Sequence, residues 1–255
     1  MIANYHTHTV RCNHASGTEE EYILNAIERG IKILGFSDHT PYFFEGDYYS
    51  YFRMRPYLLD DYVNTINALK EKYKDKIEIH LGVEVEYYPT PFNRLLDLLR
   101  SKGVEYMLLG QHFVGDEAGE PYCGRENDSD ENLKRYVDQT IEGMETGLFT
   151  YLAHPDLLWY TGDEETYTRE MSRLCAAAKR LDMPLEINLL GLSTGRNYPN
   201  EKFWEVAAKY GCKAILGCDA HSPESLSDLQ IEKKARELAQ KVGIEIIDTV
   251  QLKRI

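Results

Sequence analysis

The sequence has no long apolar run, and no segment approaches the roughly 20 consecutive apolar residues that a transmembrane helix needs. The first ten residues carry neither the basic region nor the apolar region of a secretory signal peptide. These absences predict a cytoplasmic protein with no membrane partner.

Basic residues are also scarce, since 29 Lys and Arg stand against 42 Asp and Glu, for a formal net charge of -13. This balance argues against a nucleic-acid partner, because binding a phosphate backbone normally requires a basic face. An acidic surface suits a small substrate that carries an amine. The five cysteines are odd in number and form no C-x-x-C pair, which argues against both a disulfide framework and a thiolate zinc site.

What the chain does contain is a regular alternation of short apolar runs with segments of helical periodicity. Strands are expected at Ile2–His6, Ile33–Ser37, Ile77–Glu84, Tyr106–Gly110, Phe149–Ala153, Leu185–Asn188 and Ala214–Gly217. Helices are expected at Glu19–Arg29, Tyr57–Tyr73, Phe92–Ser101, Glu131–Thr146, Glu165–Leu181, Glu201–Lys209 and Glu224–Lys241. The alternation predicts an α/β fold, a distorted (βα)7 barrel of the TIM type with parallel strands, outer helices and one domain over residues 1–255. A last apolar run, Ile244–Ile247, is expected as an edge strand or as a tail packed on the barrel.

Seven of the eight histidines fall at or just after the expected carboxyl ends of strands. They are His6, His8, His14, His39, His112, His154 and His221, and the acids Glu84 and Asp219 lie at the same level. Because the carboxyl ends of barrel strands converge on one rim, these side chains should meet in one pocket. His80 lies inside a strand instead, so a structural role is expected for it.

The local spacings agree with a metal site. His6-x-His8 and Asp219-x-His221 each place two side chains on the same face of an extended segment. Imidazole and carboxylate suit zinc, manganese and iron. Asp38-His39 alone could be a turn residue beside a packed imidazole, and Glu84 alone could be a buried ion pair, but so many clustered imidazoles would be costly to bury without cations.

Together these residues resemble the motifs of the PHP (polymerase and histidinol phosphatase) superfamily. The matching segments are His6-Thr7-His8, Ser37-Asp38-His39-Thr40, Gly82-Val83-Glu84, Gly110-Gln111-His112-Phe113, Ala153-His154-Pro155 and Asp219-Ala220-His221. A free-standing chain of this length resembles the histidinol-phosphatase branch. The resemblance implies three divalent metal ions, zinc, manganese or iron, held by His6, His8, Glu84 and Asp219; by Glu84, His112 and His154; and by His14, His39 and His221.

The same resemblance implies hydrolysis of L-histidinol phosphate to L-histidinol and phosphate, a step of histidine biosynthesis. A hydroxide that bridges two metals is expected to attack phosphorus while Asp219 holds the first of them. Arg196 lies in a segment similar to a phosphate-binding loop of that branch, and its alternative is a solvated loop arginine. Asp38 is a candidate proton donor to the leaving oxygen, although orienting a ligand imidazole suits it equally.

Other interpretations remain open at this point. The aromatic segment 41–55 could be a lid over the substrate or a loop packed by its own side chains. The substrate could be a nucleotide or a nucleic-acid 3′ end, or the barrel could be an amidohydrolase or a non-catalytic metal-binding module. The sequence does not indicate the oligomeric state or the native metal.

Overall fold

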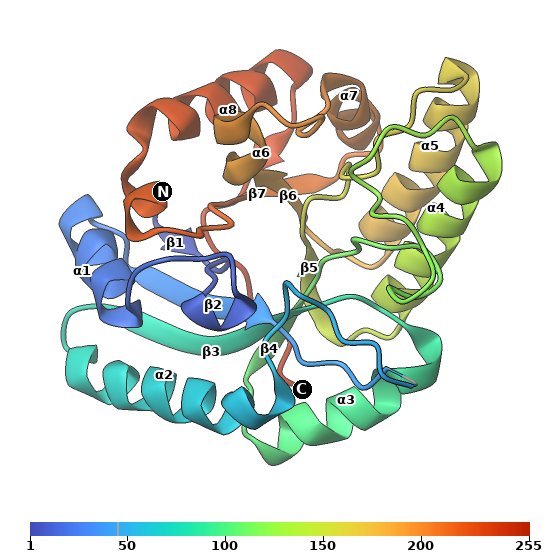
Figure 1. Cartoon of the computed structure of the whole chain (residues 1–255). Coiled ribbons are helices and arrows are strands. Elements are labelled where there is room, and N and C mark those ends of the chain that lie inside the picture. The colour runs from blue at the N-terminus through green and yellow to red at the C-terminus, as the bar shows by residue number, and fades with distance from the viewer. Residues whose placement is uncertain (45) are drawn as a thin grey trace.

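A computed structural model describes residues 1–44 and 46–255, and within them eight parallel strands form one sheet in the order β1 to β8. The strands are β1 (Ala3–Asn4), β2 (Ile33–His39), β3 (Glu78–Val85), β4 (Tyr106–Leu109), β5 (Phe149–Leu152), β6 (Leu185–Asn188), β7 (Lys213–Gly217) and β8 (Glu245–Ile246). Figure 1 shows the sheet curled around a central axis with the helices outside it. The TIM-like α/β barrel expected from the sequence is therefore confirmed.

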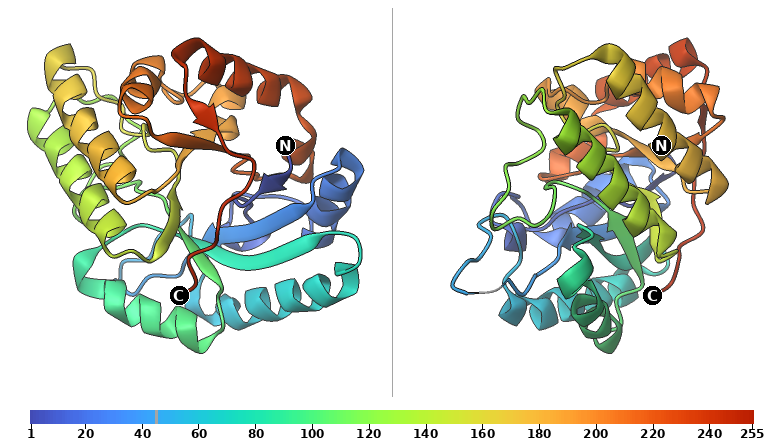
Figure 2. Two further views of the ribbon diagram at one scale, coloured as in Figure 1. Left: turned by 180° about the vertical axis from the view of Figure 1, so that it is seen from behind. Right: turned by 90° about the vertical axis from the view of Figure 1, so that its right-hand side faces the viewer.

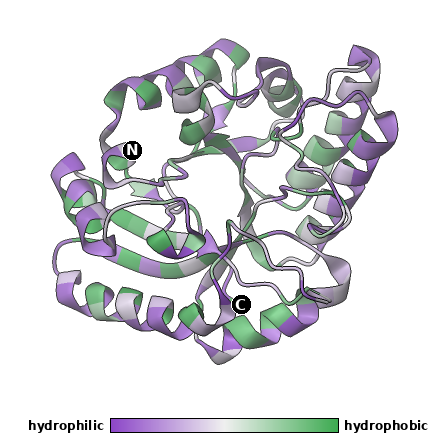
Figure 3. Ribbon diagram, in the orientation of Figure 1, coloured by the Kyte–Doolittle hydropathy of each residue, from purple (hydrophilic) through white to green (hydrophobic). Residues whose placement is uncertain are grey.

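The helices follow the expected alternation closely. They are α1 (Glu19–Arg29), α2 (Leu59–Tyr73), α3 (Pro89–Ser101), α4 (Asp130–Glu145), α5 (Glu164–Arg180), α6 (Leu189–Thr194), α7 (Glu201–Lys209) and α8 (Leu229–Val242). Thr18 and Glu21 form the predicted capping box, in which each side chain binds a backbone N–H of the other residue. In Figure 3 the strands at the centre are mostly hydrophobic, and the helices around them carry both hydrophobic and hydrophilic residues. Such mixed hydropathy is expected for helices that bury one face only.

Most predicted boundaries are shifted by up to three residues, and two differences are larger. The helix expected from Glu224 begins only at Leu229, because the Asp228 side chain caps it by accepting hydrogen bonds from two backbone N–H groups. The residues before it, Pro223–Ser227, form a 3-10 turn. Part of the loop expected after the sixth strand is the short helix α6, which the Asn188 side chain caps.

Different strand pairings complete the barrel at its two ends. At the carboxyl end, Thr7 after β1 pairs in parallel with Ala220 after β7, so the first and last barrel segments meet. At the amino end, β8 pairs with Lys213 and Ala214 of β7 as the expected edge strand. The chain then crosses the amino-terminal opening, as the rear view in Figure 2 shows.

This terminal segment, residues 247–255, forms a floor for the barrel. Val250 and Leu252 pack against a cluster that includes Tyr5 and Tyr106 in the barrel interior. His80 lies nearby, with its two ring nitrogens 2.9 Å and 3.1 Å from carboxylates of Glu78 and Glu105 respectively. The contacts of His80 therefore fit the structural role expected from its place within a strand.

Candidate metal centre

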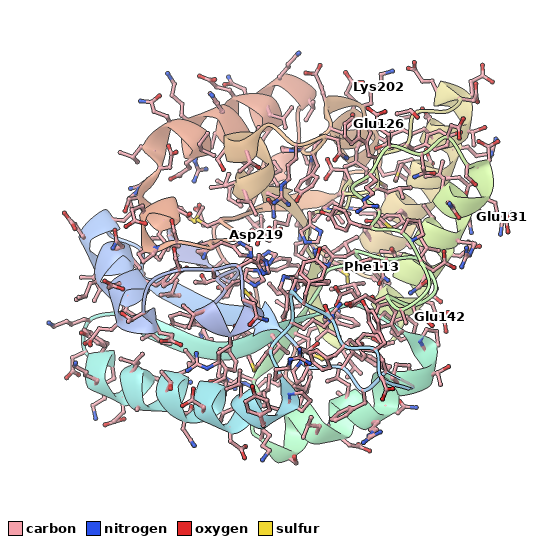
Figure 4. All side chains as sticks on the ribbon, in the orientation of Figure 1. Phe113, Glu126, Glu131, Glu142, Lys202 and Asp219 are labelled. Carbon is pink, nitrogen blue, oxygen red and sulfur yellow. The ribbon has the colours of Figure 1, made fainter. Side chains whose placement is uncertain are left out.

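The nine expected metal ligands meet at the carboxyl end of the barrel. Glu84 lies at the centre, with a carboxylate oxygen 2.8–3.8 Å from a ring nitrogen of each of five imidazoles: His6, His8, His39, His112 and His154. Asp219 lies 3.0–3.5 Å from the imidazoles of His6, His8 and His221, and His14 lies 2.9 Å from His221. Figure 4 shows Asp219 near the middle of the barrel mouth.

The backbone makes room for this cluster. A Cβ atom on Gly110, directly after β4, would lie 1.9 Å from Oε1 of Glu84. His154 and Asp219 both have positive φ angles, 27° and 47°, which are uncommon for residues with a side chain. Such strain persists only where the surrounding structure enforces it, and it is concentrated at functional sites.

Two of the short distances at the centre are not ordinary hydrogen bonds. Nε2 of His8 lies 3.0 Å from Asp219, and Nδ1 of His39 lies 3.0 Å from Oε2 of Glu84. Both nitrogens and that Glu84 oxygen are nevertheless buried without a hydrogen-bond partner. Two ligands of one tetrahedral zinc ion, each about 2.1 Å from the metal, lie roughly 3.4 Å apart. The atoms are thus spaced as ligands of shared cations, and the residues present fit a metal centre.

Groups of three side chains whose donor atoms lie within 4.8 Å of one another include His6, His8 and Asp219; His6, Glu84 and His154; His8, His39 and Glu84; and His14, His39 and His221. The first group is part of one set that the family resemblance implies, and the last group is another of those sets in full. His112 approaches Glu84 at 3.8 Å, beside His154. Glu84 and His39 each belong to more than one group, so the groups share one continuous cluster.

Glu84, Asp219 and His221 are held in the forms that bind metals, whereas carboxylates outweigh burial and raise the pKa values of His6 and His8. Burial alone would raise the pKa of Glu84, but imidazoles led by His39 and His112 hold that pKa well below its usual value. Burial also opposes ionisation of Asp219, and His6 and His8 lower its pKa in the same way. Burial lowers the pKa of His221 to about 3. Ionised carboxylates and a neutral imidazole are the forms that bind metals.

Several imidazoles are oriented through the nitrogen that faces away from the centre. Nδ1 of His6 lies 2.8 Å from Glu186, and Nδ1 of His112 lies 2.7 Å from Glu86. Nδ1 of His14 lies 2.8 Å from the backbone oxygen of Cys12. A partner on one ring nitrogen fixes the tautomer and leaves the other nitrogen to the metal.

Sequence reasoning missed Glu86 and Glu186. A signal existed, because Glu84-x-Glu86 and Glu186-x-Asn188 each place two polar side chains on one face of a buried strand. Buried acids in strands otherwise need a partner, so their presence there indicates a polar network.

Asp38 lies beneath the cluster. Its Oδ1 lies 3.5 Å from Nδ1 of His8 and accepts a hydrogen bond of 2.8 Å from the backbone N–H of His39. Thr9 donates a hydrogen bond to its other oxygen, and the side chain is completely buried. Of the two roles considered for Asp38, orienting an imidazole matches these contacts better than delivering a proton into the pocket.

A pocket of about 900 Å³ opens over the cluster. His14, His39, His112, His221 and Asp219 form its floor, and Phe52, Phe113, Tyr122, Trp159, Tyr160 and Tyr198 supply much of its wall. Arg196 also lines it and donates a hydrogen bond of 2.7 Å to the hydroxyl of Tyr198. The predicted phosphate-binding arginine therefore faces the same space as the candidate ligands.

The segment 41–55 lies beside the pocket, although Glu45 lies outside the described residues. Phe52 lies against the imidazoles of His39 and His112, with ring centroids 5.1 Å and 6.0 Å apart. Arg53 is fully buried, 2.6 Å from Glu86 and 2.6 Å from Glu117, so it is not free to bind phosphate. The segment is packed by its own side chains and also contributes to the pocket wall.

Comparison with known proteins agrees with this fold. The PHP domain matches residues 4–189, so the chain belongs to the PHP domain family. Among its curated relatives, the "Probable histidinol-phosphatase" of Deinococcus radiodurans is 26% identical over 231 residues, covering 87% of each chain. The protein of the same name from Schizosaccharomyces pombe is 26% identical, covering 89% of this chain and 82% of its own length.

A solved structure extends the comparison to three dimensions. Histidinol phosphate phosphatase from Lactococcus lactis, crystallised with zinc, L-histidinol and phosphate, superimposes with a TM-score of 0.75 at 20% identity. The match covers 99% of this chain and 98% of that one. Across the described residues, no helix is both long and apolar enough to cross a membrane.

Proposed function

We propose that this protein is a metal-dependent phosphomonoesterase that hydrolyses L-histidinol phosphate to L-histidinol and phosphate. The observation that carries the proposal is the convergence of seven imidazoles, Glu84 and Asp219 under a pocket that Arg196 also lines. The Lactococcus protein with the same fold is solved with zinc, L-histidinol and phosphate, which supports this substrate.

Three divalent cations are proposed for the centre, of which zinc is supported by that neighbour. The residues that would hold them are those of the three sets: His6, His8, Glu84 and Asp219; Glu84, His112 and His154; and His14, His39 and His221. Bound there, divalent cations would lower the pKa of a water molecule and neutralise the charge of a phosphate group.

The chain's own residues would bind and orient the substrate. Arg196 carries a planar guanidinium that can bind two phosphate oxygens, and the hydroxyl of Tyr198 holds one end of it at 2.7 Å. Asp38, Glu86 and Glu186 would orient the imidazoles of His8, His112 and His6 through their Nδ1 atoms. We assign no residue to protonating the leaving oxygen.

The organic part of the substrate would occupy the outer pocket. Its aromatic wall offers flat surfaces on which an imidazole can stack, and the ring centroids of Phe113 and Tyr122 in that wall lie 5.9 Å apart. The net charge of -13 would favour the approach of a substrate that carries an ammonium group.

The test compares kcat/KM for L-histidinol phosphate with that for a panel of small phosphate esters, including nucleoside monophosphates. Metal content is measured on the same sample. We expect L-histidinol phosphate to be preferred by at least about tenfold, equivalent to about 1.4 kcal/mol of transition-state binding. A preference for a nucleotide would assign a different substrate to the same centre, and no phosphate release from any ester would overturn the enzyme itself.

A further inference from the structure

Glu186 is a buried carboxylate in the barrel interior whose contacts reach more than one candidate ligand. It lies on β6 and is completely inaccessible to solvent. Removing a carboxylate from water is costly, so a site that buries one must provide donors for both oxygens. Four polar contacts of this carboxylate show which residues it positions.

Each oxygen of Glu186 is matched by two donors. Oε1 lies 2.8 Å from Nδ1 of His6 and accepts a hydrogen bond of 3.1 Å from the hydroxyl of Tyr151. Oε2 accepts hydrogen bonds from the backbone N–H of His154, at 3.1 Å, and from Nδ2 of Asn188, at 2.9 Å. One carboxylate thus contacts the ring of one candidate ligand and the backbone of another, whose φ is the strained 27°.

Asn188 extends this network to a third candidate ligand. Its Nδ2 also lies 3.1 Å from Oδ2 of Asp219, the other residue of the cluster with a positive φ. Its Oδ1 accepts a hydrogen bond of 2.9 Å from the backbone N–H of Gly191 and so begins helix α6. The pair Glu186 and Asn188 therefore connects ligands that come from β1, β5 and β7.

The neighbouring strand is shaped around this carboxylate. A Cβ atom on Gly217, at the end of β7, would lie 1.8 Å from Oε1 of Glu186. The same relation holds between Gly110 and Glu84, the acid at the centre of the cluster. Both acids therefore occupy space that only glycine on the next strand leaves open.

We propose that Glu186 is a positioning residue that sets the mutual geometry of His6, His154 and Asp219. By accepting the Nδ1 proton of His6, it leaves the lone pair of Nε2 directed at Glu84 and Asp219, each 3.5 Å away. By holding the backbone of His154 and, through Asn188, the carboxylate of Asp219, it fixes two ligands in strained conformations. The inference rests on the proposed metal centre and concerns how tightly that centre binds its cations.

Glu186→Gln is a sharp test because an amide cannot satisfy four donors. The substitution keeps the size of the side chain but turns one acceptor oxygen into an NH2 group. That group must face either His6 and Tyr151 or His154 and Asn188, so one pair loses its acceptor. The negative charge beside His6 is lost as well.

The measurement is the dissociation constant for zinc, determined on metal-free protein by competition with a chelator and without any substrate. We expect Glu186→Gln to weaken zinc binding by about 10- to 100-fold, the usual range for partners that orient metal ligands. The visible spectrum of the cobalt-loaded protein should change with it, because the angles between ligands change. Glu170→Gln is the matched control, since Glu170 is a buried acid on α5 that binds Arg169 and Arg173.

A second variant covers the case in which Glu186→Gln does not fold. Gly217→Ala leaves Glu186 intact but displaces its carboxylate, and should also weaken zinc binding by about tenfold or more. Its control is Gly162→Ala in the exposed loop before α5, whose Cβ would instead meet the hydroxyl of Tyr160 at 2.4 Å.

The possible results separate this inference from the proposed function. Zinc affinity within about twofold of the parent in Glu186→Gln, or an equal loss in the Glu170→Gln control, would overturn the role of Glu186. If Glu186→Gln does not fold, unchanged affinity in Gly217→Ala, or an equal loss in Gly162→Ala, would do the same. Failure of the parent protein to bind zinc would instead contradict the metal centre on which both proposals rest.

Discussion

The histidines at the two ends of the barrel differ in whether their ring nitrogens have polar partners. At the amino end, both ring nitrogens of His80 face carboxylates, at 2.9 Å and 3.1 Å. At the carboxyl end, Nε2 of His6, Nε2 of His8 and Nδ1 of His39 are buried without any hydrogen-bond partner. Since buried polar atoms in folded proteins are nearly always satisfied, the unsatisfied nitrogens identify the end that is built for cations.

The two ends also differ in what covers them. Residues 247–255 cross the amino end, where Val250 and Leu252 pack on the tyrosines of the interior. The carboxyl end instead opens into the pocket of about 900 Å³. The amino end should therefore contribute to stability alone and the carboxyl end to activity. Barrels of this type place their active sites at the carboxyl ends of the strands.

Asp219→Asn should have the largest effect. The substitution removes a negative charge that lies 3.0 Å from His8 and 3.5 Å from His6 while keeping the shape of the side chain. We expect kcat/KM to fall by on the order of 10³-fold with the fold retained, measured by steady-state kinetics and circular dichroism. Near-parental activity would remove Asp219 from the ligand set.

Arg196→Ala should have an intermediate effect, and Arg254→Ala is its counterpart at the amino end. We expect loss of Arg196 to lower kcat/KM by about 10- to 100-fold and to weaken inhibition by inorganic phosphate, because a charge-assisted contact is lost. Arg254 binds Glu105 at 3.1 Å and should be replaceable within about twofold in kcat/KM. Equal effects of the two substitutions would contradict the assignment of Arg196.

Glu105→Gln should have the smallest effect on activity and act on acid stability instead. Burial raises the pKa of Glu105, but hydrogen bonds from His80 and Lys70 outweigh it and lower the pKa to about 2. A depressed pKa stabilises the fold above the unfolded value of about 4.5, and this contribution is lost as the pH falls towards 2. The variant should therefore show a flatter loss of unfolding free energy between pH 4.5 and 2 in urea titrations. An unchanged acid profile would show that Glu105 contributes nothing there.

Much of the fold was predictable because its signals are local. Strand and helix periodicity predicted all seven barrel strands, and α1 and α7 begin and end at the expected residues. The predicted start of α8 was wrong. The periodic segment begins at Glu224, but the side chain of Asp228 caps the helix, which therefore begins at Leu229. Short elements such as α6 carry too few residues for periodicity to reveal them.

The residues of the candidate site were predictable from the sequence, but the contacts between their side chains were not. Parallel strands bring their carboxyl ends together, so a list of histidines and acids at those ends implies one rim. Which atom orients which ring depends on side-chain directions across strands far apart in sequence, such as His6 and Glu186. Likewise, nothing local in the sequence shows that Arg53 turns inward to Glu86 while Arg196 faces the pocket.

The most direct test of the account is a crystal structure of the zinc-loaded protein with anomalous diffraction measured at the zinc edge. We predict a cluster of anomalous peaks between Glu84 and Asp219, each within about 2.3 Å of imidazole nitrogens at the carboxyl end, and none beside His80. Absence of any peak at Glu84, or a zinc ion bound at His80 instead, would contradict the claim that the unsatisfied imidazoles form a metal centre.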